Sequence, residues 1–243
     1  MWPAYRCYVD TPDLQVGPLT LDAAESMHLA KVRRAAPGAD VAVLNGCGQV
    51  GLARLITAGK REATLEVNRV ETRTQPSPEI TLVIGGLKQA AWDELLRHAV
   101  ELGVNRIVRV QSVHAVADVH AGKTEAKISR WREKMVQAMK QSANPWMPGV
   151  EIVDSVAMAQ ERLPQDTLQM VGAFAASAGI RAVLAEEVQG GVTLWVGPEG
   201  DFSEAELRGL RDAGVRPVHL GPRILRAETA ALAMVAAVRL GMD

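Results

Sequence analysis

The chain has 243 residues, of which 48% are hydrophobic and 23% charged, and its 27 basic and 28 acidic residues give a formal net charge of −1. This composition is ordinary for a globular protein and excludes a disordered, collagen-like or coiled-coil chain. The flat charge balance also excludes a strongly basic nucleic-acid binder, so any nucleic-acid site must be a local patch.

Targeting and metal-binding signals are absent from the sequence. Met1 to Asp10 lack the apolar run of a signal peptide, and no segment approaches the roughly 18 apolar residues of a membrane helix. Cys7 and Cys47 are too few for a disulfide framework, and the five histidines show no metal-ligand spacing. We therefore expect a cytoplasmic protein with no membrane contact and no metal.

The first 73 residues read as β-rich. Apolar runs at 40–44 and 49–56 flank Asn45-Gly46, the strongest short signal for a β-hairpin. Residues 62–70 alternate with a period of two, which places Ala63, Leu65 and Val67 on one face. With one short helix at residues 22–32, residues 1–73 are predicted to form a compact β-barrel.

A proline-containing linker at residues 74–78 then predicts a domain boundary, with a second domain at 74–243. Beyond the linker, strand and helix patterns alternate, which predicts an α/β domain with a parallel sheet covered on both faces. Strands are expected at 80–84, 106–110, 168–173, 192–196 and 215–220, and helices at 90–102, 123–141, from Ser203 and at 228–240.

The first candidate site is the loop Gly197-Pro198-Glu199-Gly200, between a buried strand and a helix that opens with the capping box Ser203 to Glu206. In open α/β sheets ligands bind at such strand ends, and glycine lets the backbone approach a ligand. The alternative is a plain strand-to-helix turn. Neither a Walker loop nor GxGxxG is present, so nothing points directly to nucleotide binding.

The second candidate site is the segment 219–230, where another strand runs through Gly221-Pro222 toward a helix. Arg223, Arg226 and Glu228 crowd this junction, and Thr229 is placed to help cap the helix. The alternative is a surface salt bridge between one of the arginines and Glu228.

Together these segments make the chain resemble the bacterial 16S ribosomal RNA uridine-N3 methyltransferases of the SPOUT class. The family's GPEG and LGxRILRxETA motifs match Gly197–Gly200 and Leu220–Ala230. Further matches are Lys88, the ELGV sequence at 101–104, Lys140-Gln141-Ser142, and an N-terminal helix with His28 and Val32-Arg33-Arg34. The similarity covers nearly the whole chain.

The resemblance implies an α/β domain with a deep trefoil knot, preceded by a PUA-like β-barrel that binds RNA. It implies S-adenosylmethionine bound in the knot loops and a homodimer whose active site draws on both subunits. It also implies that the substrate is the 16S rRNA of the small ribosomal subunit. The reaction would transfer a methyl group to N3 of one uridine.

The chemistry of the implied reaction suggests roles for individual residues. Arg226 would stabilise a developing uracil anion, while Glu199 or Glu228 would act as base or hold an arginine, with a structural role left open for both glutamates. RNA contacts would come from Lys31, Arg33, Arg34, Lys88 and Arg223. Cofactor contacts would come from Gly172, Gly197, Pro198, Glu199, Gly200, Leu220, Gly221, Ile224, Leu225 and Thr229.

Three positions depart from the family pattern. Asp201 replaces the usual glycine after GPEG, and Val113-His114-Ala115 and Ser142-Ala-Asn144-Pro-Trp146 lack arginines that many members carry. These changes bear on RNA contact more than on cofactor binding.

Two further questions stay open. Residues 123–140 carry six basic and two acidic side chains, which fits either a phosphate-tracking face or simply a solvated helix. Trp131 and Trp146 could stack on bases or belong to the core. Alternative functions are an RNA ribose 2′-O-methyltransferase of the same fold and a non-catalytic RNA-binding assembly factor.

Overall fold

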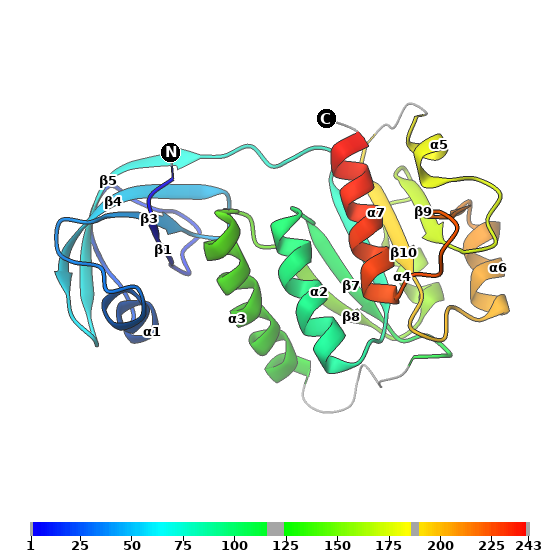
Figure 1. Cartoon of the computed structure of the whole chain (residues 1–243), viewed down its shortest axis with the longest axis horizontal. Helices are drawn as coiled ribbons and strands as arrows, with labels where there is room; N and C mark the ends of the chain where they lie inside the picture. Colours follow the sequence, from blue (N-terminus) through cyan, green and yellow to red (C-terminus); the bar gives the residue numbers. More distant parts are fainter. Residues whose placement is uncertain (1, 116–123, 186–189, 242–243) are drawn as a thin grey trace. The chain divides into compact units, whose positions relative to one another are not determined.

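The computed structural model describes residues 2–115, 124–185 and 190–241 (Figure 1). The chain divides into two compact units, which we call the N-terminal unit (residues 1–75 and 135–147) and the C-terminal unit (residues 76–134 and 148–243). The division near residue 75 lies close to the expected boundary. Residues 135–147, which we expected in the second domain, pack instead with the first.

The N-terminal unit is built on a five-stranded sheet. Strands β3 and β4 pair antiparallel around Asn45-Gly46, which confirms the predicted hairpin, and Ala63, Leu65 and Val67 are all buried, as their alternation predicted. The strand order is β1-β3-β4-β5-β2, with β1 (Tyr5–Tyr8), β2 (Gly17–Thr20), β3 (Asp40–Leu44), β4 (Gln49–Ala58) and β5 (Ala63–Thr72).

The predicted short helix is present as α1 (Ala23–Met27), which continues as a π-helical turn, η1 (His28–Val32). The Asp22 side chain caps α1 by accepting a hydrogen bond of 2.8 Å from the backbone N–H of Glu25. Leu29 is buried in the same core as the strand residues, so the helix closes the apolar face of the sheet.

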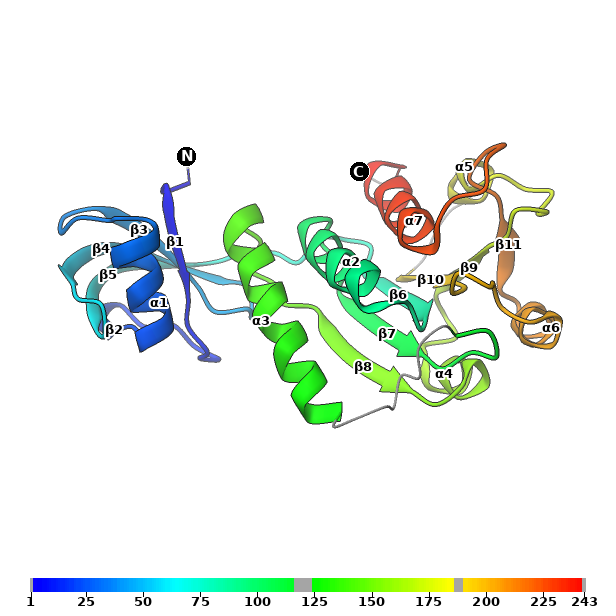
Figure 2. The same cartoon turned by 60° about the horizontal axis from the view of Figure 1, so that its bottom comes forward.

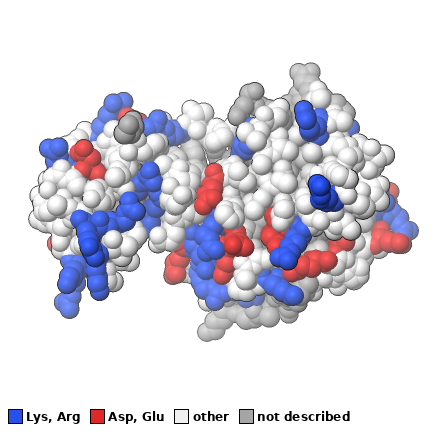
Figure 3. All heavy atoms as spheres, in the orientation of Figure 1, with Lys and Arg blue, Asp and Glu red and all other residues white. Residues whose placement is uncertain are grey.

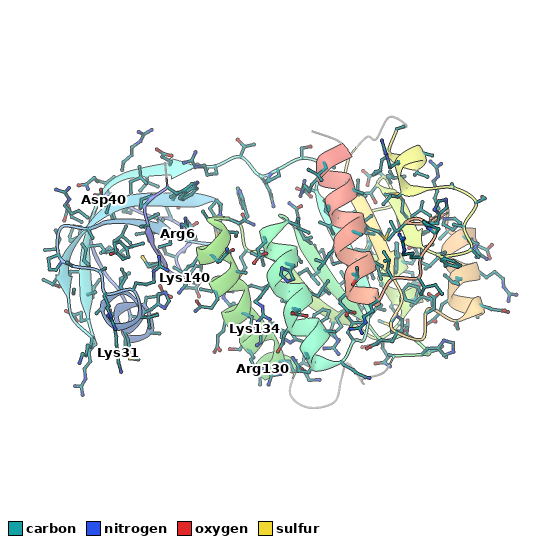
Figure 4. All side chains as sticks on the ribbon, in the orientation of Figure 1. Arg6, Lys31, Asp40, Arg130, Lys134 and Lys140 are labelled. Atoms are coloured by element: carbon teal, nitrogen blue, oxygen red, sulfur yellow. The ribbon has the colours of Figure 1, made fainter. Side chains whose placement is uncertain are left out.

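The end of helix α3 (Thr124–Ser142) belongs to the N-terminal unit through a buried ion pair. Lys140 Nζ lies 2.5 Å from Glu25 Oε1, and Glu25 Oε2 accepts a 3.2 Å hydrogen bond from the Tyr8 amide. Arg6 donates to the carbonyls of Lys140 and Gln141 from the facing strand (Figure 4). Lys140 is therefore buried, and its inclusion in a basic surface patch was wrong.

The C-terminal unit has a six-stranded, wholly parallel sheet, which confirms the predicted α/β architecture. The spatial order of the strands is β11-β9-β10-β6-β7-β8. Strands β7 and β8 follow on one side of β6, and the later strands β9, β10 and β11 lie on the other side, so the direction of winding reverses between β6 and β10. The strands are β6 (Ile80–Gly85), β7 (Arg106–Val110), β8 (Gly149–Val153), β9 (Leu168–Gly172), β10 (Val192–Val196) and β11 (Arg216–Val218).

Helices cover both faces of this sheet (Figure 2). On one face α7 (Ala227–Gly241) packs on β10, β6 and α2 (Gln89–Glu101), and α5 (Ile180–Leu184) packs on α7. On the other face α4 (Val156–Arg162) and α6 (Glu204–Asp212) share a core with Val83, Val108 and Trp195. Every strand and helix named in the sequence prediction is present, whereas β1, β2, β8, α4 and α5 were not predicted.

None of the helices in the described ranges is both long and apolar enough to cross a membrane. The same residues contain no cluster of three or more histidine, cysteine or acidic side chains suited to a metal ion.

Candidate active site

A cavity of about 800 Å³ opens at the carboxyl ends of the central strands of the C-terminal unit. Its walls are the segments that follow β6, β9, β10 and β11, together with the first turns of α2 and α7. Ligands of open α/β sheets bind at the point where the strand order reverses, which here lies between β6 and β10. The volume lies in the range of about 300–1,000 Å³ that is typical of small-molecule sites.

The loop after β10 is a tight turn that forms one wall. The Asp201 amide donates a 2.9 Å hydrogen bond to the Pro198 carbonyl, and Asp201 has a φ of 59°. Aspartate tolerates this left-handed conformation because its side chain bonds locally, and Oδ1 accepts a 2.7 Å hydrogen bond from the Phe202 amide. Asp201 therefore takes the place of the family's glycine without losing the turn.

Two glycines permit the close packing of this wall. A Cβ on Gly197 would lie 2.6 Å from Asp201 Oδ1, and a Cβ on Gly85, the last residue of β6, would lie 2.5 Å from Pro198 Cδ. Contacts this short would force the backbone apart, so both positions require glycine. Gly197 could be identified from the sequence, whereas Gly85 could not, since its contact with Pro198 joins segments far apart in the chain.

The same loop is fastened from outside the cavity. The capping box is confirmed, since Ser203 accepts from the Glu206 amide and Glu206 accepts from the Ser203 amide. Glu206 Oε1 also accepts a 3.0 Å hydrogen bond from the Val113 amide, and His114 Nδ1 lies 3.1 Å from the Gly200 carbonyl. A carbonyl only accepts, so Nδ1 carries the proton. His114 therefore holds the loop from outside the cavity.

The loop after β11 forms the opposite wall. The His219 amide donates to the Ala178 carbonyl at 2.9 Å, and the Ile180 amide donates to the His219 carbonyl at 3.1 Å. The His219 side chain then accepts a 3.2 Å hydrogen bond from the Gly221 amide through Nδ1. These bonds fix the start of the loop that carries Leu220 to Arg226 into the cavity wall.

Charged side chains stand at the cavity without partners. Lys88, Glu199, Arg223 and Arg226 are exposed and Glu228 is half-buried. Within the described part of the chain, none of the five forms an ion pair or a side-chain hydrogen bond, so the alternative of an arginine–Glu228 salt bridge is not observed. Figure 3 shows basic and acidic side chains interspersed over one face of the C-terminal unit.

The structure brings most of the predicted site residues together. The cavity is lined by Lys88, Gly172, Gly197, Pro198, Glu199, Leu220, Gly221, Arg223, Ile224, Leu225, Arg226 and Glu228. Gly200 and Thr229 do not line it. Lys31, Arg33 and Arg34 are exposed on and beside η1 in the N-terminal unit, where Figure 4 shows Lys31 extending outward. Lys123, the first residue of the basic run at 123–140, lies outside the described residues.

The cavity residues that were not predicted as site residues are Ala90, Ala91, Glu94, Ala173, Phe174, Val196, Asp201, Val218, Ala227 and Ala230. The small residues at the start of α2 gave no signal. Phe174 follows the predicted strand 168–173 directly, and its position at a strand end was the available clue.

Below the cavity, Arg109 is buried at the end of β7. Its guanidinium carbon lies 4.8 Å from the ring centre of Trp92 and 5.6 Å from that of Trp131, and Nη2 donates to the Leu87 carbonyl at 3.0 Å. Burial lowers the pKa of Arg109, and the two indole faces offset part of the cost of desolvating its charge. Trp131 thus belongs to the core, and Arg109 anchors Leu87, the residue before Lys88, through its hydrogen bond to the Leu87 carbonyl.

Comparisons with known proteins bear on both units. Residues 74–239 match the family model of an RNA methyltransferase domain, and residues 21–68 match that of an RNA methyltransferase PUA domain. The ribosomal RNA small subunit methyltransferase E of Aquifex aeolicus is 31% identical over 226 residues, which cover 89% of this chain and 92% of that protein. The chain belongs to the ribosomal RNA small subunit methyltransferase E family.

Other members of the methyltransferase E family are similar to this chain in sequence and in structure. The Mycobacterium tuberculosis enzyme is 29% identical over 238 residues, 95% of this chain and 89% of the relative. A crystal structure of the Neisseria gonorrhoeae enzyme bound to S-adenosyl methionine superposes with a TM-score of 0.86 at 28% identity, covering 99% of this chain and 98% of that one. The predicted SPOUT fold class, PUA-like unit and enzyme class are thereby confirmed, while the path of the knot stays a prediction.

Proposed function

We propose that the chain uses S-adenosylmethionine to methylate N3 of one uridine in the 16S rRNA of the small ribosomal subunit. The observation that carries the proposal is the cavity at the β6/β10 reversal, walled by the two loops whose sequences match the family motifs. The name and the bound ligand of the Neisseria gonorrhoeae relative support the choice of substrate and cofactor.

The cavity residues fit this cofactor. Gly172, Gly197 and Gly221 line the cavity together with Leu220, and the glycines, which lack side chains, would let an adenosine approach main-chain donors and acceptors. Half-buried Leu225 would wall the adenine, whereas Ile224 is 82% exposed and so belongs at the cavity mouth. When bound, the cofactor supplies an electrophilic methyl group on its sulfonium sulfur.

The protein's own task is to prepare the uracil. The N3–H must lose its proton before or as the methyl group is transferred, and the negative charge spreads to the ring oxygens. We assign Arg226 to stabilise this anion. When RNA covers the cavity mouth, the guanidinium loses solvent, and its attraction to the negative charge becomes stronger. We assign Glu199 or Glu228, which both line the cavity, to accept the N3 proton.

RNA affinity would come from separate basic groups. Lys31, Arg33 and Arg34 would contact phosphates from the N-terminal unit, and Lys88 and Arg223 would do so at the cavity. We also infer a homodimer, as in the resemblance, and a cytoplasmic location, because assembling ribosomal subunits are the proposed substrate.

Arg226→Ala tests the assignment of the anion-stabilising group. Removing one donor to a developing anion costs about 10²–10³ in kcat. We expect that loss with small-subunit particles as substrate, while the Kd for S-adenosylmethionine changes by less than about threefold, because the cofactor contacts are assigned to backbone. Arg226→Lys should recover part of the rate. An Arg226→Ala enzyme with full turnover would show that this assignment is wrong.

A further inference from the structure

We propose that Phe174 is the residue on which the target base stacks at the mouth of the cavity. This inference rests on the proposed function and adds a substrate contact to it. Phe174 lines the cavity and is nevertheless 58% exposed, an unusual position for a phenylalanine.

The backbone around Phe174 is held at both ends. The Ala173 amide donates to the Val218 carbonyl at 2.9 Å, and the His219 amide donates to the Ala178 carbonyl at 2.9 Å. Residues 174–177 therefore form a short projection whose two ends, Ala173 and Ala178, are hydrogen-bonded to the consecutive residues Val218 and His219 at the end of β11. The Ala176 amide closes a turn onto the Ala173 carbonyl at 3.1 Å. This short, anchored projection presents the ring at the mouth with little freedom to fold away.

Exposure separates the inner part of the cavity from its mouth. Val196, Gly197, Pro198, Val218 and Ala227 are buried and form the inner part of the cavity lining. Phe174 and Ile224 are exposed apolar side chains at the mouth, beside the unpaired cations Lys88, Arg223 and Arg226. A flat apolar surface among cations suits a nucleobase attached to a phosphate backbone, whereas the adenine of the cofactor is expected on the buried side.

The chemistry requires such a surface. An enzyme that modifies a base must take it out of its stack, and the lost stacking is replaced by aromatic or apolar side chains. Among the described residues that line the cavity, Phe174 is the only aromatic one. Every base offers a π-face, so one phenyl ring serves a uracil without reading its edge, and specificity is left to the polar groups around N3.

The test compares Phe174→Leu, Phe174→Trp and Phe174→Ala, with Ala175→Ser as a control on the same projection outside the cavity lining. Methylation of small-subunit particles, the Kd for S-adenosylmethionine and the mass in solution are measured for each. Loss of one base–aromatic stack corresponds to about 5- to 150-fold in kcat/KM for RNA. We expect such a loss in Phe174→Leu and Phe174→Ala, near-normal activity in Phe174→Trp and Ala175→Ser, and unchanged cofactor affinity and mass.

Three results would overturn the proposal. Full activity of Phe174→Leu would mean that the flat ring is not needed. A weakened cofactor Kd would place the ring on the adenine, and a changed mass would place it in a subunit interface. Failure of the proposed function is recognised separately, because the unmodified enzyme would then bind no S-adenosylmethionine or methylate no RNA.

Discussion

Charged residues are used in opposite ways in the two units. In the N-terminal unit, the side chains of Glu25 and Lys140 are buried and lie 2.5 Å apart, and Glu25 also accepts a hydrogen bond from the Tyr8 amide. At the cavity of the C-terminal unit, Lys88, Arg223 and Arg226 are exposed and, among the described residues, without ion-pair partners. A paired, buried charge holds a fold together, whereas an unpaired charge at a cavity mouth stays available for a ligand.

This contrast explains how a chain of net charge −1 can act on RNA. The basic residues are not spread as a general polyanion surface, and one cation from the basic run at 123–140 is buried in the core of a unit. A second, Lys134, is paired with Asp93 at 3.1 Å. We expect the exposed cations at the cavity and beside η1, which form no ion pair among the described residues, to contribute to RNA affinity.

Lys140→Met gives the largest expected effect on stability. The substitution leaves the Glu25 carboxylate buried without its partner, and breaking a buried pair in this way costs about 3–5 kcal/mol. Chemical denaturation should show that loss in the free energy of unfolding. The matched control is Arg223→Met at the cavity, which should stay within about 0.5 kcal/mol of the unmodified protein.

A double variant separates charge burial from packing. Glu25→Gln with Lys140→Met removes both charges and keeps an acceptor for the Tyr8 amide, so it should recover most of the loss. If Lys140→Met alone unfolds no more easily than Arg223→Met, the contrast between the two units is wrong.

A smaller effect is expected from His28, which lies beside the same pair. Burial, followed by the charge of Lys140, lowers the pKa of His28 below its ordinary value of 6.5. The unfolded chain therefore binds more protons below pH 6.5, and stability falls as the pH drops through that value toward the lower pKa of the folded state. His28→Gln should flatten this part of the stability–pH curve, and identical slopes for both proteins would contradict the assignment.

Elements with strong periodicity could be predicted from the sequence, and those defined by distant partners could not. Residues 40–44, 106–110 and 192–196 coincide with β3, β7 and β10. Strand β2, Gly17–Thr20, contains a proline and forms at an edge of the sheet by pairing with β5, so its own sequence gives no strand signal. Helix α5 has only five residues, too few for a helical repeat.

The same limit applies to the site. The loops around Gly197 and Leu220 could be identified because turn residues and charges follow apolar runs. Gly85 could not be identified, because its importance depends on its contact with Pro198, and for Phe174 only the position at a strand end was a clue, since its exposure is visible only in the structure. Lys140 looked like a surface cation because its partner, Glu25, lies 115 residues away in the chain.

The most direct test of the central claim is to map methylated nucleosides in the small-subunit rRNA of cells with and without this gene, by digestion and mass analysis. The account predicts that a single 3-methyluridine disappears without the gene and returns when purified enzyme and S-adenosylmethionine are added to the unmodified particles. Loss of a ribose 2′-O-methyl group instead, or an unchanged rRNA, would contradict it.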